Sequence, residues 1–178
     1  MGYILSFHAS ARENSVGTQL ANALGIRAAE LGHEVEQIDL SKGLLCCTGC
    51  GWCNTHDECT AADDLFSKLC RCDAIFFTTP IYFCGIAGQA KLLLDRLYAM
   101  MDRSFTPRHP GKKVLTVYTQ GDPRTEIFRA TVEQTNMVFR MCGWTLADSV
   151  VVGGIDSTAP YEIDAALLHR LYMAVENL

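Results

Sequence analysis

The chain is predicted to fold as one doubly wound α/β domain, a parallel sheet of five strands covered by helices on both faces. Three observations predict this. Short apolar or β-branched runs alternate with longer amphipathic segments along residues 1–178. No internal repeat, low-complexity tract or proline-rich linker interrupts the alternation. The 178 residues and an apolar content of 49% suit a single domain with an ordinary core.

The first half of the chain shows two helix patterns of different length. Leu20, Leu24 and Ala28 recur at the spacing of one helix face, and Gly32 is suited to follow that helix. Asp63 and Asp64 fall in the first turn of a shorter helix, where the helix dipole favours acidic groups. The expected elements are a strand at 2–7, a helix at 14–31, a strand at 34–39, an irregular segment at 41–60 and a helix at 61–70.

The second half opens with the strongest strand pattern, DAIFFTT, which is expected to end at Pro80. The expected elements are strands at 73–79, 113–119 and 144–152 and helices at 87–101, 124–141 and 161–176. In such sheets ligands bind beyond the carboxyl ends of the strands. The loops after the first, third and fourth strands should therefore converge, with the loop after the second strand nearby.

Charge and composition exclude several classes of protein. The formal net charge is −5, and no basic stripe is available to neutralise phosphates, so a nucleic-acid partner is not expected. No apolar stretch approaches the ~20 residues of a membrane span, and the N-terminus does not resemble a signal peptide. A cytoplasmic protein without a membrane partner is expected. Nine cysteines in a reducing compartment then indicate metal or redox chemistry more than disulfides.

The segment after the first strand has the features of a phosphate-binding loop. It is rich in hydroxyls and small residues, contains Arg12 and runs into a helix N-terminus. It matches neither the GxxxxGK[ST] pattern nor the GxGxxG pattern, which disfavours a dinucleotide. An ordinary helix N-cap at Asn14 or Ser15 is the alternative interpretation. Placement after the first strand of a parallel sheet favours the phosphate site.

The loop after the third strand suits a flat aromatic ligand. Tyr82 and Phe83 offer aromatic surface, and Gly85 lets the backbone approach a ring. On base rates Tyr82 and Phe83 are more often ordinary core aromatics. The segment TQGDP after the fourth strand is a weaker signal, which could close over one side of the ligand.

Five cysteines fall between residues 46 and 59, and four of them follow a C-x2-C-x2-C-x5-C pattern. These are Cys47, Cys50, Cys53 and Cys59. Thiolates so close in sequence can surround one small metal centre. A 4Fe–4S cluster, a zinc site and free thiols remain as alternatives, although zinc-binding pairs usually lie further apart.

These motifs resemble a known family. SARENS is similar to the phosphate loop of the NADPH-dependent FMN reductase and flavodoxin-like flavoproteins, and TPIYFCG to their flavin loop. Ala9 stands where the family usually has glycine, and Val16-Gly17-Thr18 where it often has Asn-Thr. The resemblance implies a flavodoxin-like sheet of order 2-1-3-4-5 and an FMN site formed by Ser10, Arg12, Asn14, Ser15, Val16, Thr18, Thr79, Pro80, Ile81, Tyr82, Phe83, Cys84, Gly85, Thr119, Gln120 and Gly121.

The cysteine pattern resembles that of the iron–sulfur flavoproteins, a branch of the same group. This resemblance implies that Cys47, Cys50, Cys53 and Cys59 bind a 4Fe–4S cluster and that Cys46 is a spare thiol. Cys70 and Cys142 are interpreted as small buried apolar residues, and Cys84 as a neighbour of the flavin ring.

The leading hypothesis is a flavoprotein that passes electrons from a ferredoxin-type donor through the cluster to FMN and on to an acceptor. A cluster-free NAD(P)H-dependent FMN or quinone reductase is the first alternative, and a thiol-based redox sensor is the second. No catalytic side chain is expected, because the chemistry belongs to the flavin, and His8 and His109 are interpreted as structural or solvated. The resemblance also implies a homodimer or homotetramer, with the stretch from Tyr98 to Phe105 as a candidate interface.

Overall fold

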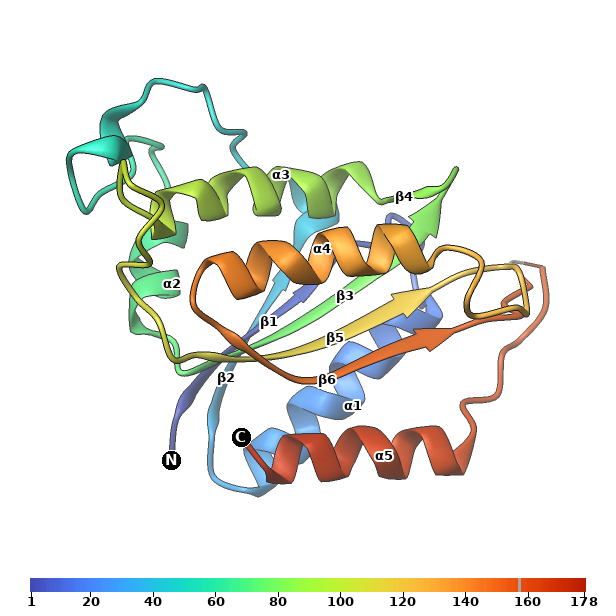
Figure 1. Cartoon of the computed structure of the whole chain (residues 1–178). Coiled ribbons are helices and arrows are strands. Elements are labelled where there is room, and N and C mark those ends of the chain that lie inside the picture. The colour runs from blue at the N-terminus through green and yellow to red at the C-terminus, as the bar shows by residue number, and fades with distance from the viewer. Residues whose placement is uncertain (157) are drawn as a thin grey trace.

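A computed structural model describes residues 1–156 and 158–178 of the chain. Its main sheet has the strand order β2-β1-β3-β5-β6, and all neighbours in it are parallel. The fourth strand is short and lies off this path, so the five long strands confirm the predicted order (Figure 1). The strands are β1 (Tyr3–His8), β2 (Glu34–Asp39), β3 (Ala74–Tyr82), β4 (Gly85–Ile86), β5 (Lys113–Thr119) and β6 (Thr145–Val152).

Helices cover both faces of this sheet, as predicted (Figure 1). One face packs against α1 and α5 through a core that includes Leu20, Leu24 and Leu171. The other face packs against α2, α3 and α4, where Phe77 and Phe139 lie with ring centroids 5.2 Å apart. The helices are α1 (Val16–Glu30), α2 (Leu65–Arg71), α3 (Gly88–Arg96), α4 (Arg129–Met141) and α5 (Ala165–Glu176), with short 3-10 turns at η1 (Leu40–Lys42), η2 (Trp52–Asn54) and η3 (Leu97–Met100).

The end of β3 differs from the prediction. Pro80 does not end the strand, which continues to Tyr82 and pairs Pro80 with Thr119 of β5. Beyond Pro80 the chain turns back through Phe83 and Cys84, and β4 pairs antiparallel with the end of β3. Proline has no backbone N–H to donate to a neighbouring strand, and it is tolerated here because it stands near the end of β3. Its carbonyl oxygen accepts a hydrogen bond from Ala87 N at 3.1 Å.

Several helices are shorter than predicted. The segments 61–64, 124–128 and 161–164 are not α-helical, and the expected helix at 87–101 divides into α3 and the 3-10 turn η3. At α5 the boundary has a clear cause, since the Asp164 side chain caps the helix by accepting from Leu167 N. Within the described residues, none of the helices combines the length and the apolar character needed to cross a membrane.

Candidate functional site

A cavity of about 410 Å³ lies at the carboxyl ends of β3 and β5, next to the N-terminus of α1. This is the edge of the sheet where a doubly wound fold binds its ligand. The cavity brings together the loops after β1, β3 and β5, which are far apart in the sequence. Its lining includes eleven of the predicted flavin-site residues: Ser10, Arg12, Asn14, Ser15, Val16, Pro80, Ile81, Tyr82, Thr119, Gln120 and Gly121.

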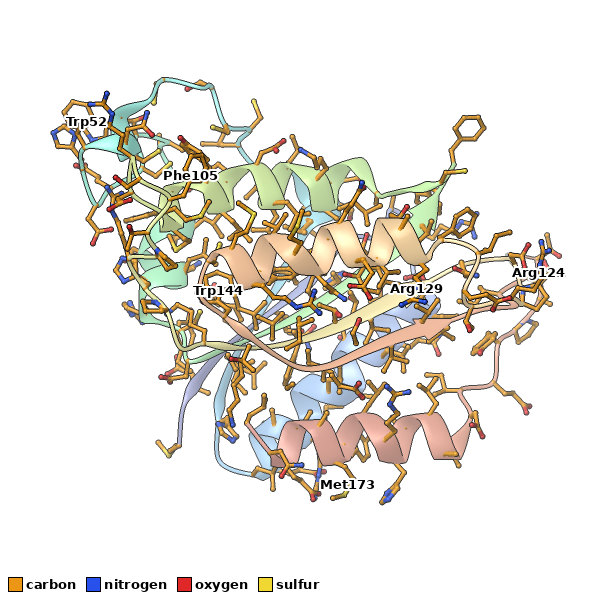
Figure 2. The ribbon with its side chains drawn as sticks, viewed as in Figure 1. Trp52, Phe105, Arg124, Arg129, Trp144 and Met173 are labelled. Atoms are coloured by element: carbon orange, nitrogen blue, oxygen red, sulfur yellow. The ribbon has the colours of Figure 1, made fainter. Side chains whose placement is uncertain are left out.

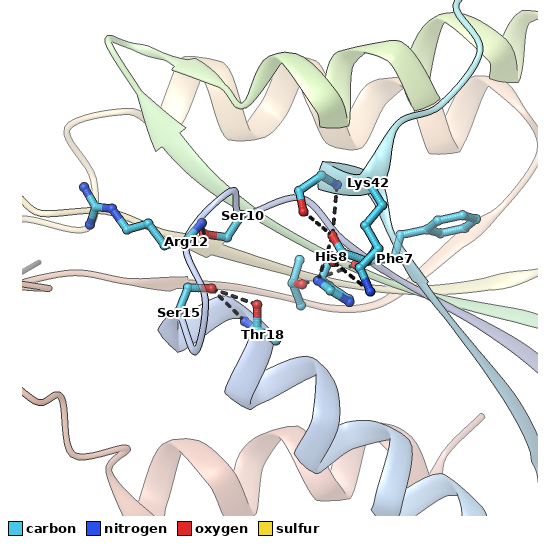
Figure 3. A network of polar contacts seen from close by, with 10 residues as sticks. Phe7, His8, Ser10, Arg12, Ser15, Thr18 and Lys42 are labelled. Carbon is cyan, nitrogen blue, oxygen red and sulfur yellow. Dashed lines mark hydrogen bonds and ion pairs between the residues drawn. The ribbon is translucent and has the colours of Figure 1, made fainter.

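The loop after β1 combines helix capping with ligand-facing groups. Ser15 is the N-cap of α1, and its Oγ accepts from Thr18 N at 3.1 Å and lies 2.9 Å from Thr18 Oγ1 (Figure 3). Ser10 Oγ accepts from Arg12 N at 3.2 Å, while the Arg12 side chain extends away from the loop (Figure 3). The capping interpretation therefore holds for Ser15, and the same loop presents an arginine and a helix N-terminus to the cavity. Such a loop fits a phosphate group.

Gln120 supplies an acceptor that no described residue satisfies. Its Nε2 donates to the carbonyl oxygens of Asp122 and Arg124, both at 2.9 Å, which fixes the orientation of the amide. Its Oε1 is buried and has no hydrogen-bond partner among the described residues. Because Gln120 lines the cavity, Oε1 is available to a ligand N–H, and the imide edge of an isoalloxazine ring carries one. These groups fit FMN.

Five predicted flavin-site residues lie outside the lining of this cavity: Thr18, Thr79, Phe83, Cys84 and Gly85. The Thr18 hydroxyl is hydrogen-bonded with the Ser15 hydroxyl. Thr79 is buried, and its Oγ1 donates to the Pro80 carbonyl oxygen at 3.2 Å. Phe83 and Cys84 form the tip of the hairpin between β3 and β4, with φ angles of 48° and 68°. Phe83 is fully exposed, so it is not a core aromatic.

Sequence reasoning missed the segment after β6. Ile155, Asp156, Ala159, Pro160 and Tyr161 line the cavity, as do Glu13 and Gln19 from the first loop and α1. Gly153 lets this segment pass close to the β5 loop, because a Cβ there would lie 2.6 Å from the Asp122 carbonyl oxygen. The Gly153-Gly154 pair directly after a strand was the available signal.

A second cavity, of about 420 Å³, is lined by all five clustered cysteines: Cys46, Cys47, Cys50, Cys53 and Cys59. Its other wall comes from the end of α3 and from η3, including Asp95, Arg96 and Tyr98. The five thiols are free. Hydrogen bonding from the Thr60 hydroxyl, 3.4 Å from the sulfur, lowers the pKa of Cys50, whereas burial raises the pKa of Cys53.

The cysteine loop has little regular structure of its own, and side chains from outside hold it. Arg96 donates to the Leu45 carbonyl oxygen at 3.0 Å and to both Asp63 carboxylate oxygens at 2.7 and 2.8 Å. Tyr98 Oη donates to Asn54 Oδ1 at 2.9 Å. Tyr98 and Phe105, expected at an interface, thus lie beside the cysteine loop, with ring centroids 6.1 Å apart.

The four predicted ligands share one cavity but do not converge on a single ion. Within the described part of the chain, no three His, Cys, Asp or Glu side chains are arranged to hold one metal ion. A zinc site holds each sulfur about 2.3 Å from the ion, so its thiolates lie close together. A polynuclear cluster is larger and keeps its thiolates further apart. The four thiols are unpaired and line one 420 Å³ cavity, and thiolates are the donors that an iron–sulfur cluster takes.

The remaining cysteines and histidines differ in part from expectation. Cys142 is buried as predicted, but Cys70 is only partly buried and its Sγ lies 3.3 Å from His109 Nε2. The same nitrogen lies 3.0 Å from Asp57 Oδ1, so His109 is not isolated. His8 also has an acidic neighbour, since its Nδ1 lies 3.7 Å from Asp39 Oδ1.

The two cavities lie at opposite ends of α3, and none of the residues that the structure describes lines both. The prediction that the cysteine loop lies near the ligand edge is wrong. The loop leaves β2 at that edge but passes to the far end of α3, where Arg96 fixes it. Figure 2 shows Trp52 and Phe105 at the cysteine end and Arg124, in the β5 loop, at the other end. The nine residues of α3 span about 13 Å.

The fold and its ligand edge define the class of this protein as flavodoxin-like. A flavodoxin of Streptococcus pneumoniae superposes with a TM-score of 0.64 at 15% identity, covering 98% of this chain and 94% of that one. An NAD(P)H:quinone oxidoreductase of Methanothermobacter marburgensis superposes with a TM-score of 0.70 at 15% identity, covering 99% and 93%. At such identities the likeness shows the fold alone.

Sequence comparison defines the family. The model described as NADPH-dependent FMN reductase matches residues 3–156. An iron–sulfur flavoprotein of Methanocaldococcus jannaschii is 32% identical over 137 residues, which cover 75% of this chain and 66% of that protein. Matches to three iron–sulfur flavoproteins of Archaeoglobus fulgidus cover 44–62% of their lengths, so the chain spans less than two thirds of these relatives. The chain belongs to the NADPH-dependent FMN reductase family, in its iron–sulfur flavoprotein branch.

Proposed function

We propose that this protein is an FMN-dependent oxidoreductase of the iron–sulfur flavoprotein type. FMN would occupy the cavity at the carboxyl ends of β3 and β5, where it supplies hydride or single-electron chemistry. The observation that carries the proposal is that eleven predicted flavin-site residues from three separate loops line this one cavity. Arg12 and the α1 N-terminus would hold the phosphate, Gln120 Oε1 would accept from the ring imide, and Tyr82 would cover part of the ring.

The finer part of the proposal concerns the second cavity. Cys47, Cys50, Cys53 and Cys59 would hold a 4Fe–4S cluster, which accepts one electron at a time from a reduced iron–sulfur protein of the ferredoxin class. The five cysteines in the lining of this cavity and the names of the curated relatives support this assignment. The nine free cysteines support a reducing, cytoplasmic setting.

Anaerobic purification followed by a visible spectrum, flavin quantification and iron and acid-labile sulfide analysis tests both parts. We expect one FMN, four irons and four sulfides per chain. Cys59→Ser should lose iron and keep FMN, while the matched control Cys46→Ser, at the spare thiol of the same cavity, should keep both. A wild-type protein with flavin but without iron would refute the cluster, and one without flavin would refute the whole proposal.

A cluster-free NAD(P)H-dependent FMN or quinone reductase is the second candidate. The separation of the cavities favours it, because the flavin cavity requires no residue of the cysteine loop. Anaerobic mixing with NADPH or NADH distinguishes the candidates. Rapid flavin reduction by a nicotinamide in the iron-free Cys59→Ser variant would support the second candidate. Reduction only through a reduced ferredoxin and an intact cluster would support the first.

We also propose that the protein forms a homodimer or homotetramer. The fully exposed Phe83 at the hairpin tip supports this, as do Trp52 and Phe105, which are exposed at the cysteine end. Light scattering of the wild type and of Phe83→Ser tests the assembly. A monomeric wild type would refute it.

A further inference from the structure

The side chain of Arg96 joins the two ends of the cysteine loop. Leu45, whose carbonyl oxygen accepts from Nη1, directly precedes Cys46. Asp63, whose carboxylate accepts from both Nη1 and Nη2, follows Cys59 by a few residues. The two partners lie 51 and 33 residues away from Arg96 in sequence. One guanidinium on α3 thus fixes how far apart the loop begins and ends.

The same guanidinium faces the cysteine cavity. Arg96 lines the cavity together with Cys59, and its side chain is only 2% exposed. Its Nε is buried and has no hydrogen-bond partner within the described residues. Hydrogen bonds to Asp63 raise the pKa of Arg96, and the neighbouring Cys59 sulfur adds to this effect. A buried N–H without a partner is costly, so Nε–H is a donor available to a group inside the cavity.

We propose that Arg96 is a positioning residue of the cysteine centre, which clamps both ends of the loop and donates its Nε–H to a sulfur atom of the iron–sulfur group held there. This rests on the proposed function, because it takes the cavity to hold that group. One electron from a ferredoxin-class donor adds one negative charge, and no bond is made or broken. The Arg96 cation stabilises that charge, and the Asp63 carboxylate partly offsets the cation.

Redox titration of the loaded protein tests the electrostatic part. Arg96→Gln should make the reduction equilibrium about tenfold less favourable. For a one-electron couple this lowers the midpoint potential by ~59 mV. Asp63→Asn should shift it in the opposite direction, because the arginine keeps its charge and one acceptor. The matched control is Arg140→Gln, which removes an exposed arginine on α4 that lines neither cavity. Equal midpoint potentials of the iron-loaded wild type and the iron-loaded Arg96→Gln variant would overturn this role.

Limited proteolysis of the metal-free chain tests the clamp independently of any cluster. Cleavage within residues 45–63 should be at least tenfold faster in Arg96→Gln than in Arg140→Gln, with Arg96→Lys between them. Equal cleavage rates would overturn the clamp. A wild type that binds no iron would refute the proposed cluster, and with it the donation by Nε, whereas the proteolysis result would still decide the clamp. If Arg96→Gln retains too little iron for titration, Arg96→Lys, which keeps the charge, should titrate closer to wild type than Asp63→Asn does.

Discussion

Arg108 donates from Nη1 to the carbonyl oxygen of Cys53 at 2.6 Å, although the two residues lie 55 positions apart. The same nitrogen donates to the His56 carbonyl oxygen at 2.8 Å, so one arginine organises the turn between the third and fourth predicted ligands. Two charge-assisted bonds to backbone oxygens are strong for partly exposed groups. The cysteine loop is therefore held at its middle from the segment before β5.

We expect Arg108→Ala to loosen the middle of the cysteine loop. Loss of the two hydrogen bonds should cost about 1–3 kcal/mol of local stability. Hydrogen exchange at residues 53–58 should become faster, while exchange in β1 and β3 stays unchanged. Arg103→Ala, which removes an exposed arginine of the same segment, is the control. Unchanged exchange at residues 53–58 would show that the loop is held by other contacts.

The hairpin tip offers a stabilising substitution. Cys84 has a φ of 68°, a conformation that costs a non-glycine residue about 1–2 kcal/mol. Cys84→Gly relieves this strain and should raise the free energy of unfolding by about 0.5–1 kcal/mol. The gain is smaller than the strain because glycine also adds conformational freedom to the unfolded chain. Cys84→Ser separates the loss of the thiol from the relief of the backbone. Urea unfolding that ranks Cys84→Gly no higher than Cys84→Ser would contradict the strain argument.

Gln120→Leu should weaken FMN binding. The substitution removes the buried Oε1 acceptor and the two hydrogen bonds that hold the β5 loop in shape. A lost hydrogen bond of about 1.4 kcal/mol corresponds to tenfold in the dissociation constant, and flavin fluorescence quenching measures it. Gln134→Leu, at an exposed position of α4, should bind FMN like the wild type. Equal affinity in the two variants would remove Gln120 from the flavin site.

His8 should make stability depend on pH. Burial lowers the pKa of His8 below its ordinary value of 6.5, Asp39 opposes this shift and Lys42 adds to it. The unfolded chain therefore binds a proton at a pH where the folded protein does not, so stability falls as the pH drops below about 6.5. Thermal unfolding between pH 7 and pH 5 should show a weaker pH dependence in His8→Gln. The control His169→Gln, outside the core on α5, should retain the wild-type dependence.

Most of the sheet could be predicted because a buried parallel strand is recognisable as a continuous, mostly apolar run in the sequence. The run AIFFTTPI in β3 is buried throughout, and the loops that follow buried strands must meet at one edge. The hairpin at Phe83 and Cys84 is not recognisable in this way, since neither residue is a usual choice for positive φ. The part of the cavity lining that follows β6 lies beyond the motifs, and only the fold brings Ile155, Asp156, Ala159, Pro160 and Tyr161 to the cavity.

The place of the cysteine loop could not be predicted from its own residues. Its cysteine spacing predicts a metal centre, but contacts with Arg96 and Arg108 decide where the loop lies. These contacts join residues 33–55 positions apart and produce no periodic pattern. Because the loop follows β2, its position in the sequence predicts that it lies at the ligand edge. Contacts with side chains from α3 and from the segment before β5 hold it elsewhere.

The arrangement of the two cavities around α3 makes the protein modular. The cysteine loop enters and leaves its cavity beside Arg96, at Leu45 and Asp63, and contributes nothing to the flavin lining. A loop of different length or ligand set could therefore be exchanged between these two anchor points without disturbing the flavin cavity. One scaffold could in this way carry loops with different ligand sets beside the same first cavity.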